Sequence, residues 1–175
     1  MSKINLMNAE LANRIAAGEV IDRPASVVKE LVENSIDAKS KRIQISISEA
    51  GKKEIRVADD GTGMDRVDAE LCFLRHASSK LKSIYDLRRI TTMGFRGEAL
   101  PSIASISNVE MTTYDGGNAP GTKVTIVPGS EPIIEDSLQR KGTIFTVRNL
   151  FFNTPARLKY LKLSLIHISE PTRRS

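Results

Sequence analysis

The sequence predicts an α+β fold, in which helices pack on a mixed, largely antiparallel sheet. Three observations predict it: a helical apolar stripe early in the chain, two alternating isoleucine-rich runs that follow it, and three strand candidates in the second half. Helices and strands that come in separate blocks are typical of helices gathered on one face of such a sheet. The expected architecture is therefore a two-layer sandwich of helices on a sheet.

The first well-marked helix is expected to begin at Pro24. Apolar residues recur there at intervals of three and four, the spacing of a buried helical stripe. They are Val27, Val28, Leu31, Val32 and Ile36. Proline is well tolerated at a first helical position, and Ser26 could cap free amides. A shorter helix is expected before it, over residues 8–17, because Gly18 would end it.

Two alternating runs after this helix predict a β-hairpin. Isoleucine occupies positions 43, 45 and 47, and Ile55 and Val57 repeat the alternation after a turn over residues 49–52. Such alternation gives a strand one buried and one exposed face. Asp59 is therefore expected where the second strand ends.

Helices and then strands are expected in the rest of the chain. Asp65 followed by Asp68 has the pattern of a capped start for a helix over residues 66–74. A short turn is expected over 84–89 and a helix over 99–105. Strands are expected over residues 108–114, 122–127 and 143–148. Thr154 and Pro155 have the pattern of a cap and the first residue of a last helix.

Composition narrows the class of protein. The chain has 175 residues, 40% of them hydrophobic, which suffices for one core. Its formal charge of +5 is compatible with nucleic acid binding, but the basic residues are scattered. The single cysteine, Cys72, excludes an internal disulfide, and its apolar neighbours predict a core position. Without a signal peptide or a run of roughly 18 apolar residues, a cytoplasmic protein with no membrane contact is expected.

The last stretch of the chain, residues 163–175, differs from the rest. Its sequence resembles the conceptual translation of a sequencing adapter that was read through at the end of a short DNA fragment. We therefore expect that the printed sequence stops representing the native protein near Lys162. Segments of this origin do not belong in fold reasoning, so His167, one of only two histidines, is left out of the functional interpretation.

Glu30 and Asn34 are the first candidate functional pair. Successive helical residues turn by about 100°, so these two side chains lie roughly 40° apart at the edge of the apolar stripe. Taken alone, they are expected to be ordinary solvated polar residues. Two glycine-containing loops change this expectation: the acidic loop over residues 59–64, and the loop over residues 93–98, which places two glycines around Arg96.

The common phosphate-binding motifs do not fit this chain. Residues 116–123 come nearest to a Walker A sequence, but Lys and Thr are reversed, and the segment lies between two expected strands. A hairpin loop is therefore expected there. Gly61 and Gly63 do not form a dinucleotide fingerprint either, because Arg66 occupies the third glycine position. A nucleotide would have to be held in another way.

The residue types present suit such a site. Asp59 could accept a hydrogen bond from an adenine amino group, while Gly61 and Gly63 let the backbone approach the base. Asn34 offers an oxygen to Mg²⁺, which typically takes few protein ligands and completes its shell with phosphates and water. Glu30 would then be placed to orient or deprotonate an attacking water, a role worth about 10²–10⁴-fold.

The glycines of residues 93–98 could serve the phosphates. They would free backbone amides to surround a phosphate at the start of the following helix, where the helix dipole favours anions.

Five motifs and the segment over residues 15–24 resemble those of the MutL family of DNA mismatch repair proteins, in the ATPase superfamily of gyrase B, Hsp90 and sensor histidine kinases. The motifs are Glu30-Leu-Val-Glu-Asn-Ser-Ile-Asp-Ala38, Asp59-Asp-Gly-Thr-Gly63, His76-Ala-Ser-Ser-Lys80, Gly94-Phe-Arg-Gly-Glu-Ala-Leu100 and Asn153-Thr-Pro-Ala-Arg157. The resemblance covers residues 1 to about 162. The last two motifs separate MutL from its superfamily relatives.

The resemblance implies an ATP-binding domain over residues 1–162, of the Bergerat type, with ATP and Mg²⁺ as cofactors. It implies Glu30 as general base, Asn34 as Mg²⁺ ligand and Asp59 as the residue that reads adenine. Gly61, Gly63 and Thr143 would line the base pocket. The lid and phosphate contacts would be Ser78, Ser79, Lys80, Arg96, Gly97, Glu98, Ala99 and Leu100, and further nucleotide contacts would be Asp37, Ala38, Met64, Gly94 and Phe95.

The resemblance also implies partners. ATP would close two N-terminal regions into a homodimer, with the first 20 or so residues as an exchanged arm, and hydrolysis would reopen them. MutS, strand-incision and unwinding enzymes, and DNA along a basic groove are the expected partners. MutL proteins continue into a second domain that supplies a lysine to the γ-phosphate. We therefore expect the chain as given to bind ATP weakly and hydrolyse it poorly.

Two other classes stay open. A sensor histidine kinase would share the fold, but the chain has no separate phospho-accepting histidine helix, since His76 lies at the expected lid edge. A non-catalytic nucleotide- or DNA-binding module is suggested only by the basic balance. Glu30 argues against this module, because a binding module has no need for a base one turn from a metal-binding amide.

Overall fold

The computed structural model describes residues 17, 21–74 and 96–161, with the side chains of residues 96–98 excepted. The named elements are α2 (Pro24–Asp37), β1 (Ile43–Ser48), the 3-10 turn η1 (Glu49–Gly51), β2 (Glu54–Asp59), α3 (Arg66–Leu71), α5 (Arg96–Ser105), β3 (Asn108–Tyr114), β4 (Gly121–Ile126), β5 (Ile133–Ser137) and β6 (Gly142–Arg148). A last helix covers residues 155–161. No helix in these ranges is long and apolar enough to cross a membrane.

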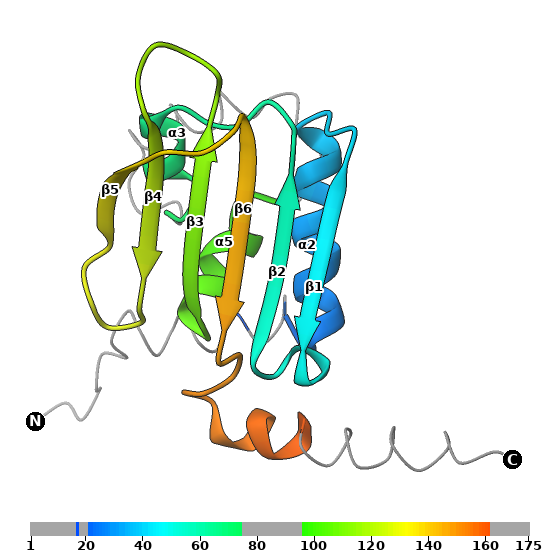
Figure 1. The fold of residues 1–175 in the computed structure, drawn as a ribbon. Helices are drawn as coiled ribbons and strands as arrows, with labels where there is room; N and C mark the ends of the chain where they lie inside the picture. The colour runs from blue at the N-terminus through cyan, green and yellow to red at the C-terminus, as the bar shows by residue number, and fades with distance from the viewer. Residues whose placement is uncertain (1–16, 18–20, 75–95, 162–175) are drawn as a thin grey trace, which may run out of the picture.

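One sheet organises these elements. Its strand order is β1-β2-β6-β3-β4-β5, and every pairing among the described strands is antiparallel. The helices α2, α3 and α5 lie against one face of it (Figure 1). The expected sandwich of helices on a largely antiparallel sheet is therefore confirmed. The last strand, β6, lies between β2 and β3, and this order brings Thr143 opposite Asp59.

The core lies between the sheet and the helices. Alternate residues of the central strands point toward the helices and are buried, which is the pattern expected of a sheet covered on one face. They include Ile55, Val57, Val109, Met111, Phe145 and Val147, which pack with Val27 and Leu31 of α2 and Ile103 of α5. Cys72 is buried in the same core, as predicted, with its sulfur 4.0 Å from that of Met111.

The prediction that Ile36 is buried is wrong. The buried line of α2 runs through Val27, Leu31 and Ser35, and Ile36 stands about 100° from Ser35 on the helix. Its side chain is 61% exposed. Val28 and Val32, also on the predicted stripe, are only half-buried. The part of α2 that is fully buried is therefore narrower than the sequence predicted.

The start of α2 also differs from the expectation. Pro24 is the first helical residue, as predicted, but Ser26 does not cap the helix. Its hydroxyl donates instead to Asp22 Oδ1 at 2.6 Å, and this bond, together with Arg23, lowers the pKa of Asp22. By contrast, Asp65 caps α3 as predicted, since its side chain accepts from the Asp68 N–H at 2.8 Å.

Other boundaries shift by a few residues. The helix α3 ends at Leu71, earlier than expected, and α5 begins at Arg96, inside the expected loop. The edge strand β5 was not predicted, because Ile133-Ile-Glu-Asp-Ser137 does not alternate and only pairing with β4 defines it. The turn expected over 84–89 and the helix expected over 8–17, apart from Ala17, lie outside the described residues.

We expect Met111→Ala to lower the free energy of unfolding by about 2–5 kcal/mol, because it empties a fully buried site in the core. Urea unfolding monitored by circular dichroism measures the change. The matched control is Ile45→Ala on the edge strand, where the side chain is already 47% exposed and the loss should be smaller. Equal losses would contradict the assignment of the core.

Candidate functional site

A cavity of about 170 Å³ opens where the end of α2, the β2–α3 loop and the start of β6 meet. It is lined by Asn34, Asp37, Ala38, Asp59, Thr62, Gly63, Met64, Leu100, Thr143 and Phe145. All of these except Thr62 and Phe145 are nucleotide contacts expected from the sequence. The fold therefore brings residues from four separate stretches of the chain to one place.

Asp59 lines this cavity and is held by three donors. Its Oδ2 accepts from the hydroxyl of buried Ser35 at 2.7 Å. Its Oδ1 accepts from the backbone N–H groups of Gly61 at 2.9 Å and Thr143 at 3.3 Å. A carboxylate offers about four acceptor positions, so this group is fixed in orientation and can still accept a further hydrogen bond.

Thr113 is a residue of the site that sequence reasoning missed. Its Oγ1 accepts from the Met64 N–H at 2.9 Å and lies 2.8 Å from the Oγ1 of Thr143. These bonds tie the β2–α3 loop to the sheet and hold Met64 against the cavity. The signal in the sequence was the alternation Val109, Met111, Thr113, which places a polar side chain on the buried face of β3.

The two glycines of the loop are required by packing. A Cβ at Gly61 would lie 2.6 Å from the carbonyl oxygen of Ala38, to which Thr62 N–H donates at 2.9 Å. Gly63 has a φ of +67°, and a Cβ there would overlap the carbonyl oxygen of Tyr114. Gly61 thus lets the loop pack against the end of α2, and it does not itself line the cavity.

Asn34 has the properties of a ligand-binding amide. It lines the cavity, and its Nδ2 is buried without a hydrogen-bond partner among the described residues. Rotation of the terminal amide by 180° would place Oδ1 in the same position. An amide oxygen that meets open space is a suitable ligand for a hard cation such as Mg²⁺.

Glu30 lies one helical turn before Asn34 on α2. It is half-buried and is not among the residues that line the cavity. Asp37 is exposed at the end of the helix and Ala38 is half-buried just after it. The same helix therefore carries both members of the candidate pair, and of the two it is Asn34 that lines the cavity with Asp59.

Part of the expected site lies outside the described residues. This applies to Ser78, Ser79, Lys80, Gly94 and Phe95. Arg96, Gly97 and Glu98 form the first turn of α5, but their side chains are not described. Ala99 and Leu100 are buried, and Leu100 lines the cavity. The middle of α5 therefore lies at the cavity, and the phosphate contacts expected from the glycine loop stay a prediction.

Neighbouring Asp60 has a different role from Asp59. Its Oδ1 accepts from the backbone N–H groups of Lys41 at 2.8 Å and Arg42 at 2.9 Å. The bond from Arg42 is the main reason that the pKa of Asp60 is lowered. Asp60 is exposed and fixes the segment that leads into β1, so only Asp59 faces the cavity.

Comparison with known families and curated proteins points to one group of ATPases. Residues 22–127 match the family of histidine kinase-, DNA gyrase B-, and HSP90-like ATPases. The DNA mismatch repair protein MutL of Geobacillus sp. (strain WCH70) is 59% identical over 162 residues, which are 93% of this chain and 26% of that protein. The MutL of Acidobacterium capsulatum is 54% identical over 169 residues, 97% of this chain and 25% of that protein. The chain thus spans about a quarter of the length of these relatives.

Solved structures agree with this similarity. The N-terminal domain of a DNA repair protein superposes with a TM-score of 0.77 at 32% identity, over 93% of this chain and 47% of that one. The Aquifex aeolicus MutL ATPase domain complexed with ADP superposes with a TM-score of 0.55 at 27% identity, over 85% of this chain and 54% of that one.

We expect Gly61→Ala to lower the free energy of unfolding by about 1–3 kcal/mol, because the added methyl group would force the loop away from Ala38. The matched control is Gly117→Ala in the exposed β3–β4 loop, where the nearest atom belongs to the flexible Asp115 side chain and a change within about 0.5 kcal/mol is expected. Thermal unfolding of both variants measures the difference. A neutral Gly61→Ala would contradict the packing described here.

Proposed function

Because the chain belongs to the family of histidine kinase-, DNA gyrase B- and HSP90-like ATPases and, within it, to the MutL DNA mismatch repair proteins, we propose that its cavity binds ATP. The observation that carries this proposal is the Asp59 carboxylate, held by three donors and able to accept one more bond. An adenine amino group would supply that bond. A structural relative complexed with ADP adds support.

The proposed specificity follows from the fixed orientation of Asp59. A part-buried carboxylate held in one orientation favours ligands that offer it a donor over ligands that lack one. Thr143 and Met64 lie beside it on β6 and on the loop, where they would contact the base. We therefore expect adenine to be preferred over guanine, which carries a carbonyl oxygen at the position of the adenine amino group.

Asn34 and Glu30 would perform the hydrolysis. Asn34 would hold Mg²⁺ through its amide oxygen, and the cation would neutralise charge on the phosphates. Glu30, one turn earlier on α2, would take a proton from the water that attacks the γ-phosphorus, and ADP and inorganic phosphate would leave. The first turn of α5 would contact the phosphates through backbone N–H groups, because a helix N-terminus favours anions.

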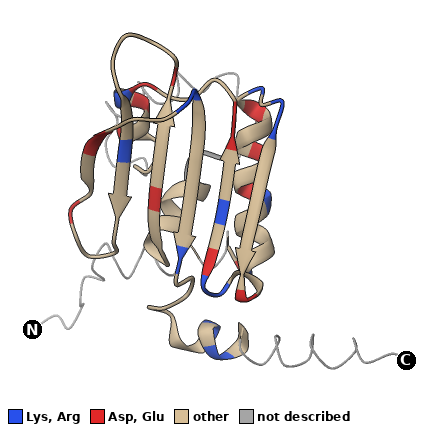
Figure 2. Cartoon of the chain, in the orientation of Figure 1, with Lys and Arg blue, Asp and Glu red and all other residues tan. Residues whose placement is uncertain are grey.

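For the whole protein we propose a role in DNA mismatch repair, as the names of the relatives state. ATP binding would close a homodimer, hydrolysis would reopen it, and MutS and strand-incision enzymes would be its partners. Lys and Arg are interspersed with Asp and Glu over the sheet in the view of Figure 2. We therefore assign DNA binding to the whole protein and not to the sheet face described here.

The 175 residues themselves would hydrolyse ATP slowly. The chain spans about a quarter of the length of its relatives, and the family resemblance places a lysine for the γ-phosphate in a second domain. We propose that this chain holds the base pocket, the metal ligand and the general base, and that turnover needs the additional lysine.

We expect Asp59→Asn to weaken binding of ATP roughly 10- to 100-fold, because a hydrogen bond to a charged group is lost and an N–H group now faces a donor. Isothermal titration with Mg²⁺ present measures the affinity. The control is Asp60→Asn, which changes the neighbouring carboxylate outside the cavity and should leave the affinity within about twofold. Similar losses in both variants would contradict the assignment of Asp59.

We expect Glu30→Ala to retain ATP binding while turnover falls by about 10²–10⁴-fold, the contribution of a general base. Turnover is best measured in a protein extended to the length of the relatives.

Asn34→Ala should instead weaken nucleotide binding only when Mg²⁺ is present. Lys29→Ala, an exposed change on the same helix, is the control for both. A wild-type turnover rate for Glu30→Ala would refute the mechanism.

A further inference from the structure

The motif Asn153-Thr-Pro-Ala-Arg157 has no part in the nucleotide site proposed above. It follows β6 and leads into the helix over residues 155–161. In Figure 1 this helix lies at the opposite end of the sheet from the end of β2, where Asp59 stands. The beginning of α2 and the end of α5 lie at the same end of the sheet as this motif (Figure 1).

The motif is bonded to the end of α5. Asn153 Nδ2 donates to the carbonyl oxygen of Ser105, the last residue of that helix, at 2.9 Å. The Phe151 N–H donates to the carbonyl oxygen of Ile106 at 2.8 Å. Carbonyl groups at a helix end lack partners within the helix, so these bonds anchor the end of α5 to the segment after β6.

The same motif is bonded to the beginning of α2. Arg157 Nη1 donates to the carbonyl oxygen of Ile21 at 2.9 Å, three residues before Pro24. The Arg157 guanidinium also lies 5.8 Å from the centre of the Phe151 ring, within range of a cation–π interaction. Ile21 and Phe151 are both buried. A single arginine thus connects the final helix, the turn after β6 and the chain entering α2.

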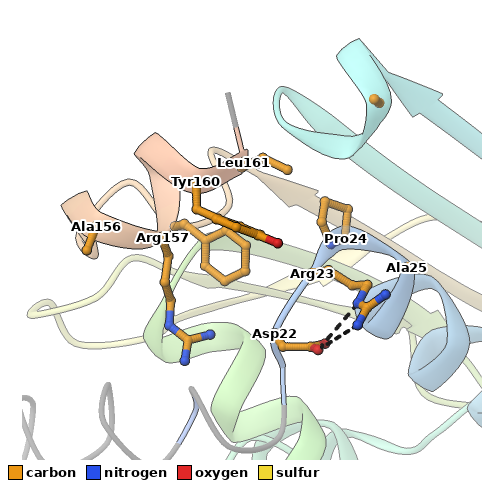
Figure 3. A pocket seen from close by; sticks show the side chains of 10 residues that line it. Asp22, Arg23, Pro24, Ala25, Ala156, Arg157, Tyr160 and Leu161 are labelled. Atoms are coloured by element: carbon orange, nitrogen blue, oxygen red, sulfur yellow. Dashed lines mark hydrogen bonds and ion pairs between the residues drawn. The ribbon is translucent and has the colours of Figure 1, made fainter. Parts of the chain in front are cut away.

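Phe151 and Arg157 also line a cavity of about 670 Å³. Figure 3 shows Tyr160 and Leu161 of the final helix on one side of it and Asp22, Arg23 and Pro24 at the beginning of α2 on the other. The two segments are therefore separated by open space over part of their length. Their relative position is maintained by the core packing of Ile21, Phe151 and Leu161 and by the directed bond from Arg157 to Ile21.

The backbone of the segment supports the same interpretation. Phe151 has a φ of +66° and is 1% exposed. A bulky side chain is unfavourable in this left-handed region and persists there only where the surroundings fix it. The surroundings in this case are the bond to Ile106 and the contact with Arg157.

We propose that residues 151–157 form a clasp that sets the position of α2 relative to α5, with Asn153 and Arg157 as positioning residues for the nucleotide site. The inference rests on the proposed ATP binding. The helix α2 carries Glu30 and Asn34, and α5 begins at the proposed phosphate contacts. An α-helix rises about 1.5 Å per residue, so Asn34 lies about 15 Å from Pro24, and the clasp acts through the length of each helix.

The clasp should affect one side of the nucleotide more than the other. Asp59 and Thr143, which would contact the base, lie on β2 and β6, whose register is set by the hydrogen bonds of the sheet. The proposed phosphate and metal contacts lie on α5 and α2, the two helices that the clasp joins. Loss of the clasp should therefore weaken binding of ADP with Mg²⁺ and leave binding of adenosine nearly unchanged.

The test compares these two ligands in the 175-residue chain by NMR titration. We expect Arg157→Ala and Asn153→Ala each to raise the Kd of ADP with Mg²⁺ by about tenfold, the effect of one well-placed hydrogen bond, and the Kd of adenosine by less than about twofold. Arg157→Lys should recover part of the ADP affinity, because an ammonium can still donate to Ile21. Lys159→Ala, exposed on the same helix, is the matched control.

Each outcome decides one of the proposals. Equal weakening of both ligands would indicate a merely structural role, since partial unfolding reduces both in proportion, and unchanged ADP affinity would overturn the clasp as well. A wild-type chain that binds neither ligand would overturn the proposed function together with the clasp. If Asn153→Ala does not fold, Arg157→Ala and Arg157→Lys carry the comparison. Hydrogen exchange in the first turns of α2 should also rise in Arg157→Ala, independently of any nucleotide.

Discussion

The fixed carboxylate of Asp59 is the interaction on which the rest of the site depends. Its three hydrogen bonds come from α2 through Ser35, from the β2–α3 loop through Gly61, and from β6 through Thr143. Three parts of the chain that are distant in sequence thus share one acceptor group. Because a polar group that is partly removed from water needs hydrogen-bond partners, these bonds both stabilise the fold at this point and give the part-buried carboxylate a single orientation toward the cavity.

The position of β6 makes this arrangement possible. This strand is the last in the sequence, but it lies inside the sheet and pairs with both β2 and β3. Thr143 therefore stands opposite Asp59 and also opposite Thr113. The polar side chains of the site lie on the helix-covered face, next to the apolar core and at one end of it. A rigid antiparallel sheet holds the proposed base contacts, while two helices hold the proposed metal and phosphate contacts.

The two helices give the molecule a long-range connection. Asn34 near the end of α2 and Leu100 of α5 line the cavity with Asp59. At the other end of the sheet, Asn153 is bonded to the last residue of α5 and Arg157 to the chain that enters α2. In the proposed clasp, residues 151–157 hold α2 and α5 at one end of the sheet. Both helices also carry the groups that would act on the metal and the phosphates. Phe151 adopts an unfavourable left-handed backbone conformation within this segment.

The sequence alone was enough to predict the elements that depend on local residue patterns. These are the helix at Pro24, the hairpin, the cap at Asp65, the strand of residues 108–114 and the end of β2 at Asp59. These depend on side-chain spacing and on capping within a few residues, which a sequence displays directly. The family motifs determined most residues of the cavity. Only the tertiary structure decided that Ile36 is exposed, that β5 is a strand and that Gly61 serves packing. It also decided that Thr113 and Arg157 form hydrogen bonds to distant parts of the chain. Each of these depends on a partner distant along the chain, because burial and hydrogen bonding are properties of residues that meet in space.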